Sequence, residues 1–179
     1  MRLIELVKER RSVRRFQEKA IPEDMMADLL EAVRWSPSWG NTQCWEVVVV
    51  KDNQVKEQLK EIVSPKNPAT KAVESAPVVF ALCGKKNSAG FYKDTAVTKF
   101  GEWMMFDLGI AAQSLCLTAH AHGLGSVIVG SMNHDAAGKI LNLPSDCEMV
   151  ALIPVGFPDK IPSPPKRKEV DEFTHSDCF

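Results

Sequence analysis

Apolar residues recur along this chain in two patterns, one with helical spacing and one in short continuous runs. Helical spacing is clearest from Met26 to Val33, where apolar residues repeat at i, i+3, i+4 and i+7 behind Pro22. Such a repeat marks one buried helix face, and proline suits a first helical position. Helices are also predicted over residues 2–11, 53–63, 69–75 and 134–141.

The continuous apolar runs are short enough for buried strands. They cover residues 46–50, 77–83, 126–130 and 148–155. Segments rich in proline, glycine, serine and asparagine separate these runs from the helical stretches, as is typical of loops. The pattern therefore predicts helices and strands that alternate along most of the chain.

The longest helical pattern runs from Asp94 to about His122. One face is formed by Phe100, Met104, Leu108, Ala111, Leu115 and Thr118 or Ala119, and Met105, Ala112 and Cys116 extend the apolar surface. A helix that is apolar nearly all round is buried on several sides. In a chain of this size a second copy of the chain is a natural cover for the extra face, which predicts a homodimer.

The composition changes from Gly156 onward. Four prolines fall within eight residues, at positions 158, 162, 164 and 165, so this segment is expected to be extended and without a core of its own. Val170, Phe173 and Phe179 follow and still need burial. Residues 157–179 are therefore predicted to form an arm that lies on another surface.

Length and charge narrow the class of protein. At 179 residues the chain is most simply one domain, residues 1–179, with an ordinary globular composition of 45% apolar and 25% charged residues. The formal net charge of −1 argues against nucleic acid as a partner, because such proteins present a broad basic face. The N-terminus lacks the apolar run of a secretory signal. The most apolar region, residues 100–130, is too polar to span a membrane.

Five cysteines are scattered without a CxxC motif or a metal-binding spacing. An odd and scattered set is typical of reduced thiols, so a cytoplasmic protein is expected. The sequence also lacks an HExxH motif, a P-loop and a readable Ser-His-Asp arrangement. This pattern fits an enzyme in which a bound cofactor supplies the chemistry.

The densest polar chemistry lies in Glu9–Phe16, ERRSVRRF, with four arginines and one serine. Guanidinium groups match phosphate or carboxylate through paired N–H donors. Val13 and Phe16 interrupt the charges, so apolar side chains can anchor in a core while the guanidinium groups reach one ligand. The alternative is a basic helix end, because cations favour helix C-termini. These residues alone leave both interpretations open.

Three separated segments together resemble the nitroreductase family of FMN-dependent oxidoreductases. They are RRSVRRF (Arg10–Phe16), SPSWGNTQCW (Ser36–Trp45) before an apolar strand, and SVIVGSM (Ser126–Met132) after a glycine-rich turn. The tail from Ile153, IPVGFPDKIPSPPKRKEVDE, also resembles the C-terminal arm of this family. The likeness rests on the order and spacing of these segments and covers nearly the full length of the chain.

The resemblance implies an α+β fold, a three-layer α/β/α sandwich around a mixed four- to five-stranded sheet. It also implies a dimer that forms through the helix at residues 94–122 and an exchanged C-terminal arm, residues 157–179. In similar proteins FMN binds at the interface and is contacted by both chains.

The cofactor contacts that the resemblance implies can be assigned residue by residue. Arg10, Arg11 and Ser12 match residues around the FMN phosphate and ribityl chain. Arg14 matches a cation beside flavin N1 and the C2 carbonyl, which is sensible because reduced flavin gathers negative charge at N1. Arg167 matches a basic residue of the tail that reaches the phosphate.

The resemblance also places seven residues around the flavin ring, namely Pro37, Ser38, Trp39, Asn41, Lys71, Gly130 and Ser131. The first four belong to a loop that the other subunit contributes in similar proteins. Gly130 and Ser131 would face the ring near N5 through their backbone, and Lys71 would be a second cation near the pyrimidine ring.

The implied activity takes a hydride from NAD(P)H to flavin N5 and then reduces an electrophile, such as a nitroaromatic or a quinone, in a ping-pong cycle. Reductive dehalogenation or alkene reduction is an alternative within the family. A flavin-binding carrier or redox sensor with little turnover is an alternative of another class. The sequence contains no feature that separates these functions.

Two departures from the family pattern lie in the loop Ser36–Trp45. Cys44 stands where the family commonly has proline, and Trp39 is larger than the usual small residue. The first is expected to loosen the loop and the second to narrow the pocket.

Overall fold

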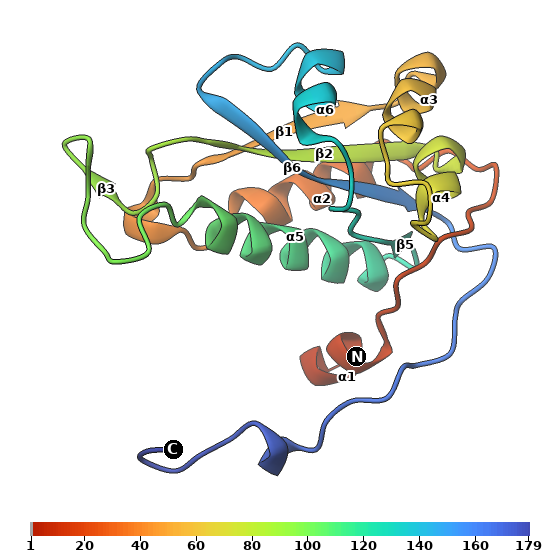
Figure 1. Cartoon of the computed structure of the whole chain (residues 1–179). Coiled ribbons are helices and arrows are strands. Elements are labelled where there is room, and N and C mark those ends of the chain that lie inside the picture. The colour runs from red at the N-terminus through yellow and green to blue at the C-terminus, as the bar shows by residue number, and fades with distance from the viewer. Residues whose placement is uncertain (1) are drawn as a thin grey trace.

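The computed structural model describes residues 2–179 as layers of helices and strands (Figure 1). The helices are α1 (Leu3–Glu9), α2 (Glu23–Arg34), α3 (Asn53–Glu61), α4 (Thr70–Ser75), α5 (Met104–Ala121) and α6 (His134–Ile140), with 3₁₀ turns η1 (Trp39–Asn41) and η2 (Val170–Glu172). The strands are β1 (Trp45–Val50), β2 (Val78–Lys85), β3 (Phe91–Tyr92), β4 (Thr95–Ala96), β5 (Gly125–Ser126) and β6 (Cys147–Gly156).

The main sheet has four strands in the order β1–β2–β6–β5, and each neighbouring pair is antiparallel. Within residues 2–179, parallel pairing is limited to one isolated bridge between Ser12 and Ser126. The predicted mixed sheet is therefore corrected to an antiparallel four-stranded sheet. The segment around Ser12 runs parallel to β5 but pairs with it at one residue only, so it does not add a parallel strand to the sheet.

The sheet is covered on both faces, which confirms the predicted α+β sandwich. Side chains of a strand point alternately to opposite faces, and β2 shows this clearly. Its Phe80 and Leu82 pack with α2 and α5, whereas Val79 and Ala81 pack with α3, α4 and α6. Figure 1 shows α5 and α2 on one side of the sheet and α3 and α6 on the other.

The long helix is shorter than the sequence pattern predicts. α5 begins at Met104, and the preceding residues form the two-stranded hairpin of β3 and β4 instead. Lys93 and Asp94 both adopt positive φ, 47° and 59°, as a tight hairpin turn requires. Gly101, at φ 66°, then separates the hairpin from the helix. Phe100, predicted on the buried face, lies outside the helix and is exposed.

The strand predicted at residues 126–130 is also shortened. β5 ends at Ser126, and contact with β6 resumes at an isolated bridge between Val129 and Leu152. Val127 donates to the carbonyl of Pro154 at 3.3 Å. Proline has no N–H to donate in return, so the ladder is interrupted at this point.

The two ends of the chain lie largely outside the layered core (Figure 1). Leu3, Ile4 and Val7 of α1 are exposed, and so are Val170 and Phe173 of the tail. The tail is extended after Gly156 except for the short turn η2, as predicted. No helix within residues 2–179 is both long and apolar enough to cross a membrane.

Candidate functional site

The arginine-rich segment Arg10–Phe16 lies along the β5 edge of the sheet. Val13 is buried, and its N–H donates to Ser126 O at 2.9 Å. Farther along, Phe16 bridges to Pro158. Each apolar residue that interrupts the charges therefore anchors the segment to β5 or to the chain beyond β6, as the sequence suggested.

Two glycines, paired across β5 and β6, lie where the arginine segment packs against the sheet. Gly125 of β5 and Gly156 of β6 are direct cross-strand partners. A Cβ on Gly125 would lie 2.6 Å from Cβ of Val13. A Cβ on Gly156 would lie 2.6 Å from Cδ of Pro77 and 3.1 Å from Cδ1 of Phe16. The close approach of the segment to β5 therefore requires a residue without a side chain at Gly125, whereas at Gly156 the tightest contact is with Pro77.

A cavity of about 230 Å³ opens between this segment and the tail. Its lining consists of Arg10, Arg11, Ser12 and Arg14 from the segment and Pro162, Ser163, Pro165 and Arg167 from the tail. The structure thus brings together all five residues that the resemblance placed around the phosphate and the flavin N1, although they lie up to 157 positions apart in the sequence.

The guanidinium groups of this cavity have no carboxylate partner within 4.0 Å among the residues that the structure describes. Arg11 Nη1 donates to the carbonyls of Lys8 and Arg10 at 2.6 and 2.8 Å, and Arg14 Nη1 donates to Ser12 O at 3.2 Å. These contacts orient the side chains without neutralising them. Several cations that share one cavity repel each other, so an anion between them is stabilising.

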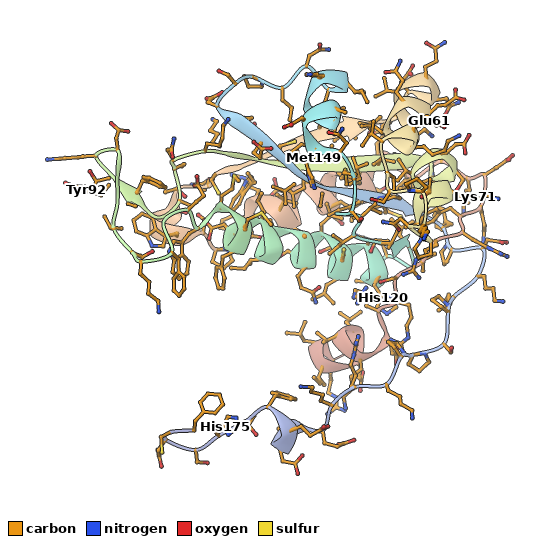
Figure 2. All side chains as sticks on the ribbon, viewed as in Figure 1. Glu61, Lys71, Tyr92, His120, Met149 and His175 are labelled. Carbon is orange, nitrogen blue, oxygen red and sulfur yellow. The ribbon has the colours of Figure 1, made fainter. Side chains whose placement is uncertain are left out.

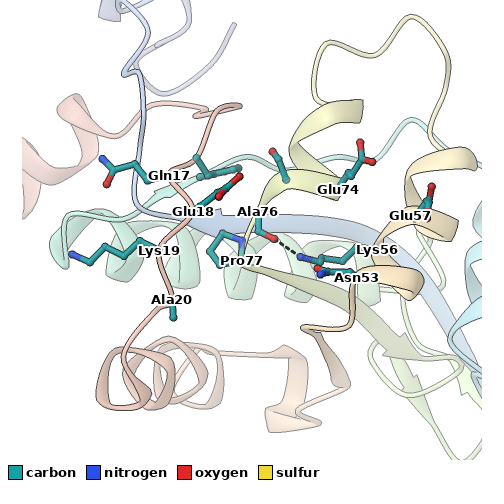
Figure 3. Close-up of a pocket in the computed structure, with 12 residues that line it drawn as sticks. Gln17, Glu18, Lys19, Ala20, Asn53, Lys56, Glu57, Glu74, Ala76 and Pro77 are labelled. Atoms are coloured by element: carbon teal, nitrogen blue, oxygen red, sulfur yellow. Dashed lines mark hydrogen bonds between the residues drawn. The ribbon is translucent and has the colours of Figure 1, made fainter.

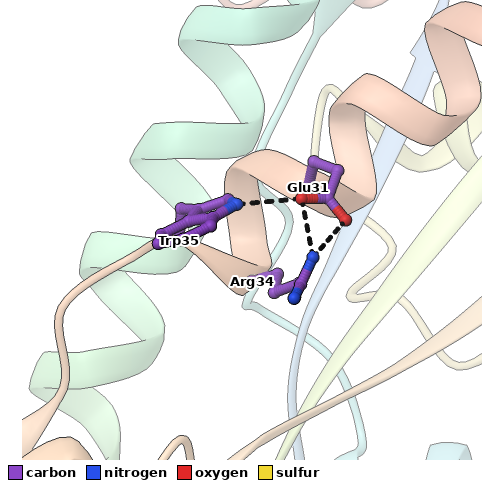
Figure 4. A network of polar contacts seen from close by, with 3 residues as sticks. All are labelled: Glu31, Arg34 and Trp35. Atoms are coloured by element: carbon purple, nitrogen blue, oxygen red, sulfur yellow. Dashed lines mark hydrogen bonds and ion pairs between the residues drawn. The ribbon is translucent and has the colours of Figure 1, made fainter.

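A surface arginine elsewhere shows the contrast. Arg34 Nη1 lies 3.0 Å from Glu31 Oε1, and the same carboxylate accepts from Trp35 Nε1 at 2.9 Å (Figure 4). The charge of that arginine is therefore paired with a carboxylate of its own helix. The guanidinium groups of the cavity instead have no carboxylate partner among the described residues. Their planar, paired N–H groups match the geometry of phosphate oxygens.

The loop Pro37–Asn41 lies away from this cavity within one chain. Trp39 N–H donates to Asp107, in the first turn of α5, whereas Arg10 and Arg11 share a small cavity with His120 near the other end of α5. Figure 2 shows His120 between α5 and α1. At about 1.5 Å rise per residue, Asp107 and His120 lie about 20 Å apart along the helix.

The remaining candidates do not line the arginine cavity either. Ser131 O accepts from Ser64 N at 3.0 Å, and the hydroxyl oxygens of these two serines lie 2.8 Å apart. Gly130 O lies 3.0 Å from Nε2 of His134. Lys71 is exposed on α4 (Figure 2). The structure leaves the flavin roles of Gly130, Ser131 and Lys71 as predictions.

Sequence reasoning missed two polar residues that hold candidate segments in place. Asp107 is buried on α5 and binds the backbone of Trp39, with both carboxylate oxygens 3.0 Å from its nitrogen. The imidazole of His134 spans Gly130 O and Met149 O, at 3.0 and 2.9 Å. The only sequence signal for Asp107 is a carboxylate inside a strongly apolar helix.

Other buried polar groups have structural roles or ordinary protonation states. A cavity of about 620 Å³ between α3 and the segment after Phe16 contains Lys56, whose Nζ donates to Ala76 O at 2.8 Å (Figure 3). Burial lowers the pKa of Lys56. Burial raises the pKa of Cys44 to about 11 and that of Cys83 to about 12, so both thiols stay protonated at neutral pH. Within residues 2–179 no cluster of side chains suited to hold a metal ion occurs.

Comparison with known proteins agrees with the fold and the motifs. Residues 7–157 match the model of the nitroreductase family. A protein from Methanothermobacter thermautotrophicus, provisionally named as an NADH dehydrogenase/NAD(P)H nitroreductase, is 27% identical over 166 residues, covering 90% of this chain and 80% of its own. The chain belongs to the nitroreductase family, a family of oxidoreductases.

Solved structures of two relatives superpose along nearly the whole chain. A nitroreductase family protein from Clostridium difficile 630 has a TM-score of 0.85 at 23% identity and covers 100% of both chains. An iodotyrosine deiodinase bound to FMN and 3-iodo-L-tyrosine has a TM-score of 0.82 at 23% identity, covering 99% of this chain and 100% of that chain. At this identity both likenesses establish the fold alone.

Proposed function

We propose that this protein is an FMN-dependent NAD(P)H oxidoreductase that reduces an electrophile, such as a nitroaromatic or a quinone, in a ping-pong cycle. The observation that supports it most is the cavity of unpaired guanidinium groups formed by Arg10, Arg11, Arg14 and Arg167. Membership of the nitroreductase family supports the same assignment, as does the FMN held by the structurally similar deiodinase.

Different residues of the cavity would bind different parts of FMN. Arg10, Arg11 and Arg167 would neutralise the phosphate, and Ser12 would add a hydroxyl donor to it or to the ribityl chain. Arg14 would place a positive charge beside the pyrimidine end of the ring. When bound, FMN supplies the hydride and electron transfer, and the protein contributes orientation and charge.

The proposed enzyme is a homodimer with each site built from both chains. In one chain the loop Pro37–Asn41 lies about 20 Å along α5 from the arginine cavity, so only a second copy can bring such a loop to the cofactor. Apolar surface is available for that contact, because Met105 and Phe106 of α5 are each 61% exposed. The exposed tail after Gly156 would lie on the second copy.

Two other functions are distinguishable from this proposal. A deiodinase-like reductive dehalogenation is favoured by the likeness to the protein that binds 3-iodo-L-tyrosine. A flavin-binding carrier or redox sensor would bind FMN with little turnover.

The test is to purify the protein with FMN and follow NADH and NADPH oxidation after adding a nitroaromatic, a quinone or 3-iodotyrosine. We expect a yellow protein whose NAD(P)H oxidation depends on the nitro compound or the quinone. Turnover of 3-iodotyrosine alone would favour dehalogenation, and bound FMN without turnover would favour a carrier. A protein that binds no FMN would contradict the proposal.

A further inference from the structure

The loop between α2 and β1 is tied to α5 by one buried carboxylate. Asp107 is 1% exposed, and both of its oxygens lie 3.0 Å from the backbone nitrogen of Trp39. Its Oδ2 also lies 3.7 Å from Sγ of Cys44. Within the described chain Asp107 has no cationic partner within 4.0 Å. Burying a carboxylate without a counter-ion costs free energy. The hydrogen bonds that Asp107 accepts must therefore offset part of this cost.

The same loop has an unusual backbone. Gly40, Asn41 and Gln43 adopt φ values of 53°, 55° and 50°, and two of these residues are not glycine. The left-handed region is unfavourable for residues with a side chain. Such conformations persist where surrounding contacts determine them. Contacts of this kind inside the loop include Asn41 N–H to Ser38 O and Thr42 N–H to Trp39 O, both at 3.0 Å, and Gln43 N–H to Ser38 Oγ at 2.9 Å.

Asp107 holds this strained turn at both of its ends. Trp39 begins η1, and Cys44 is the last residue before β1. One side chain of α5 therefore fixes the entry and the exit of the turn. A second link from α5 is weaker because it is neutral, with Ser114 Oγ 2.8 Å from Ser36 Oγ.

We propose that Asp107 is the positioning residue that fixes the loop Pro37–Asn41 in the shape that contacts the cofactor of the second subunit. This inference rests on the proposed function for its cofactor part. Asp107 itself touches the loop backbone and the Cys44 thiol, and it acts on the cofactor through Trp39 and its neighbours.

The cysteines of the chain give a direct readout of the loop. Cys44, Cys83 and Cys116 are all buried, but they lie in the loop, in β2 and in α5 respectively. A pulse of iodoacetamide, followed by mass spectrometry of each peptide, measures how often each thiol becomes accessible. Opening of the loop exposes Cys44 alone, whereas global unfolding exposes all three.

Three variants of the FMN-loaded protein separate the roles. Asp107→Leu removes both acceptors, and we expect labelling of Cys44 to be at least about tenfold faster, with labelling of Cys83 and Cys116 unchanged. Asp107→Asn keeps one acceptor for Trp39 N–H and should restore most of the protection. The matched control is Asp52→Ala, which removes a carboxylate that accepts from Val55 N at 3.0 Å at the N-cap of α3. It should leave Cys44 protected.

The cofactor part is tested by titrating FMN into the same variants. We expect Asp107→Leu to bind FMN about ten- to a hundredfold more weakly, with Asp107→Asn close to wild type. Wild-type protection of Cys44 in Asp107→Leu would overturn the inference, and so would equal acceleration at all three thiols. If the wild-type protein binds no FMN, the proposed function fails, and labelling of Cys44 alone then decides whether Asp107 anchors the loop.

Discussion

The arginine cavity and the loop Ser36–Cys44 are both assigned to the cofactor, but they are held in opposite ways. In the cavity, Arg11 and Arg14 are oriented by backbone carbonyls. Among the described residues, none of its guanidinium groups has a carboxylate partner. The loop contains left-handed residues, yet it is bound to α5 through Asp107 and Ser114. One region lacks a charge that a ligand would supply, and the other is held in place by contacts within the chain.

This difference shows two ways in which a binding site can be prepared. Unpaired charges store electrostatic repulsion that a bound anion relieves, so their effect appears mainly in affinity. A strained loop with many internal contacts has its shape fixed before binding, so its effect appears in orientation. Changes in the first region should therefore alter cofactor content most strongly, and changes in the second should alter local opening.

The strongest expected effect comes from removing one arginine of the cavity. Arg10→Ala removes a charge that the proposed phosphate needs, at a cost of about 2–5 kcal/mol, or roughly thirtyfold to several-thousandfold in affinity. The protein should fold and be purified without its yellow colour. The ratio of flavin to protein absorbance measures this. Arg34→Ala is the matched control, because Arg34 is paired with Glu31 away from the cavity. Wild-type flavin content in Arg10→Ala would contradict the assignment.

Removing the tail should change affinity and assembly together. Residues 160–179 contain Arg167, whereas Asp159 N still donates to Arg15 O at 3.0 Å and keeps the arginine segment in place. Deleting residues 160–179 should weaken FMN binding by about tenfold or more and dissociate the dimer at low concentration. Arg167→Ala should weaken FMN binding alone. Analytical ultracentrifugation distinguishes the two, and a truncated protein that stays dimeric with full flavin would refute the shared site.

Alkaline pH should destabilise the fold through its buried thiols. In the unfolded chain a thiol loses its proton near pH 9.0, whereas burial keeps Cys83 protonated to a pKa of about 12 and Cys44 to about 11. The unfolded state therefore binds fewer protons above pH 9, and stability falls as pH rises, by at most about 1.4 kcal/mol per pH unit for each thiol. Urea unfolding at a series of pH values should show a shallower fall for Cys83→Ala. Cys44→Ala should have a smaller effect, because the pKa of Cys44 is raised only to about 11 and its contribution to the slope ends near that pH.

The smallest expected effect is on the reduction potential. If Arg14 lies beside flavin N1, Arg14→Gln should lower the midpoint potential by on the order of 30 mV, which corresponds to about 1.4 kcal/mol for two electrons. FMN should remain bound, because the other cations of the cavity are unchanged. Redox titration with a reference dye measures the shift. An unchanged potential would place Arg14 away from the ring.

Local patterns in the sequence predicted the helices and central strands because each pattern reflects burial of one face. The helix Glu23–Arg34 and the strand Val78–Lys85 both lie where periodicity placed them. The pattern was wrong before Met104, because apolar residues such as Phe100 belong to a turn and stay exposed. It was also wrong after Ser126, where the missing N–H of Pro154, on a strand far along the chain, interrupts the ladder.

The candidate site divides in the same way. The anion site at Arg10–Phe16 could be predicted because its apolar and basic residues are neighbours in the sequence. The family resemblance added Arg167. The contact of Asp107 with Trp39 joins residues 68 positions apart, and no periodic pattern records it. Within one chain the loop Pro37–Asn41 also lies away from the cavity. The sequence indicated this only through the family resemblance, which implied that the second subunit contributes the loop.

The paired glycines of β5 and β6 influence the position of the cavity's arginines without contributing any charge. Gly125 and Gly156 have no Cβ, and this leaves room for Val13 and Phe16. The arginine segment can therefore lie close to the sheet. Gly125→Ala would keep every guanidinium group and still displace the segment that presents them. We therefore expect one added methyl group at Gly125 to weaken binding of the proposed phosphate, although it changes none of the residues proposed to bind it.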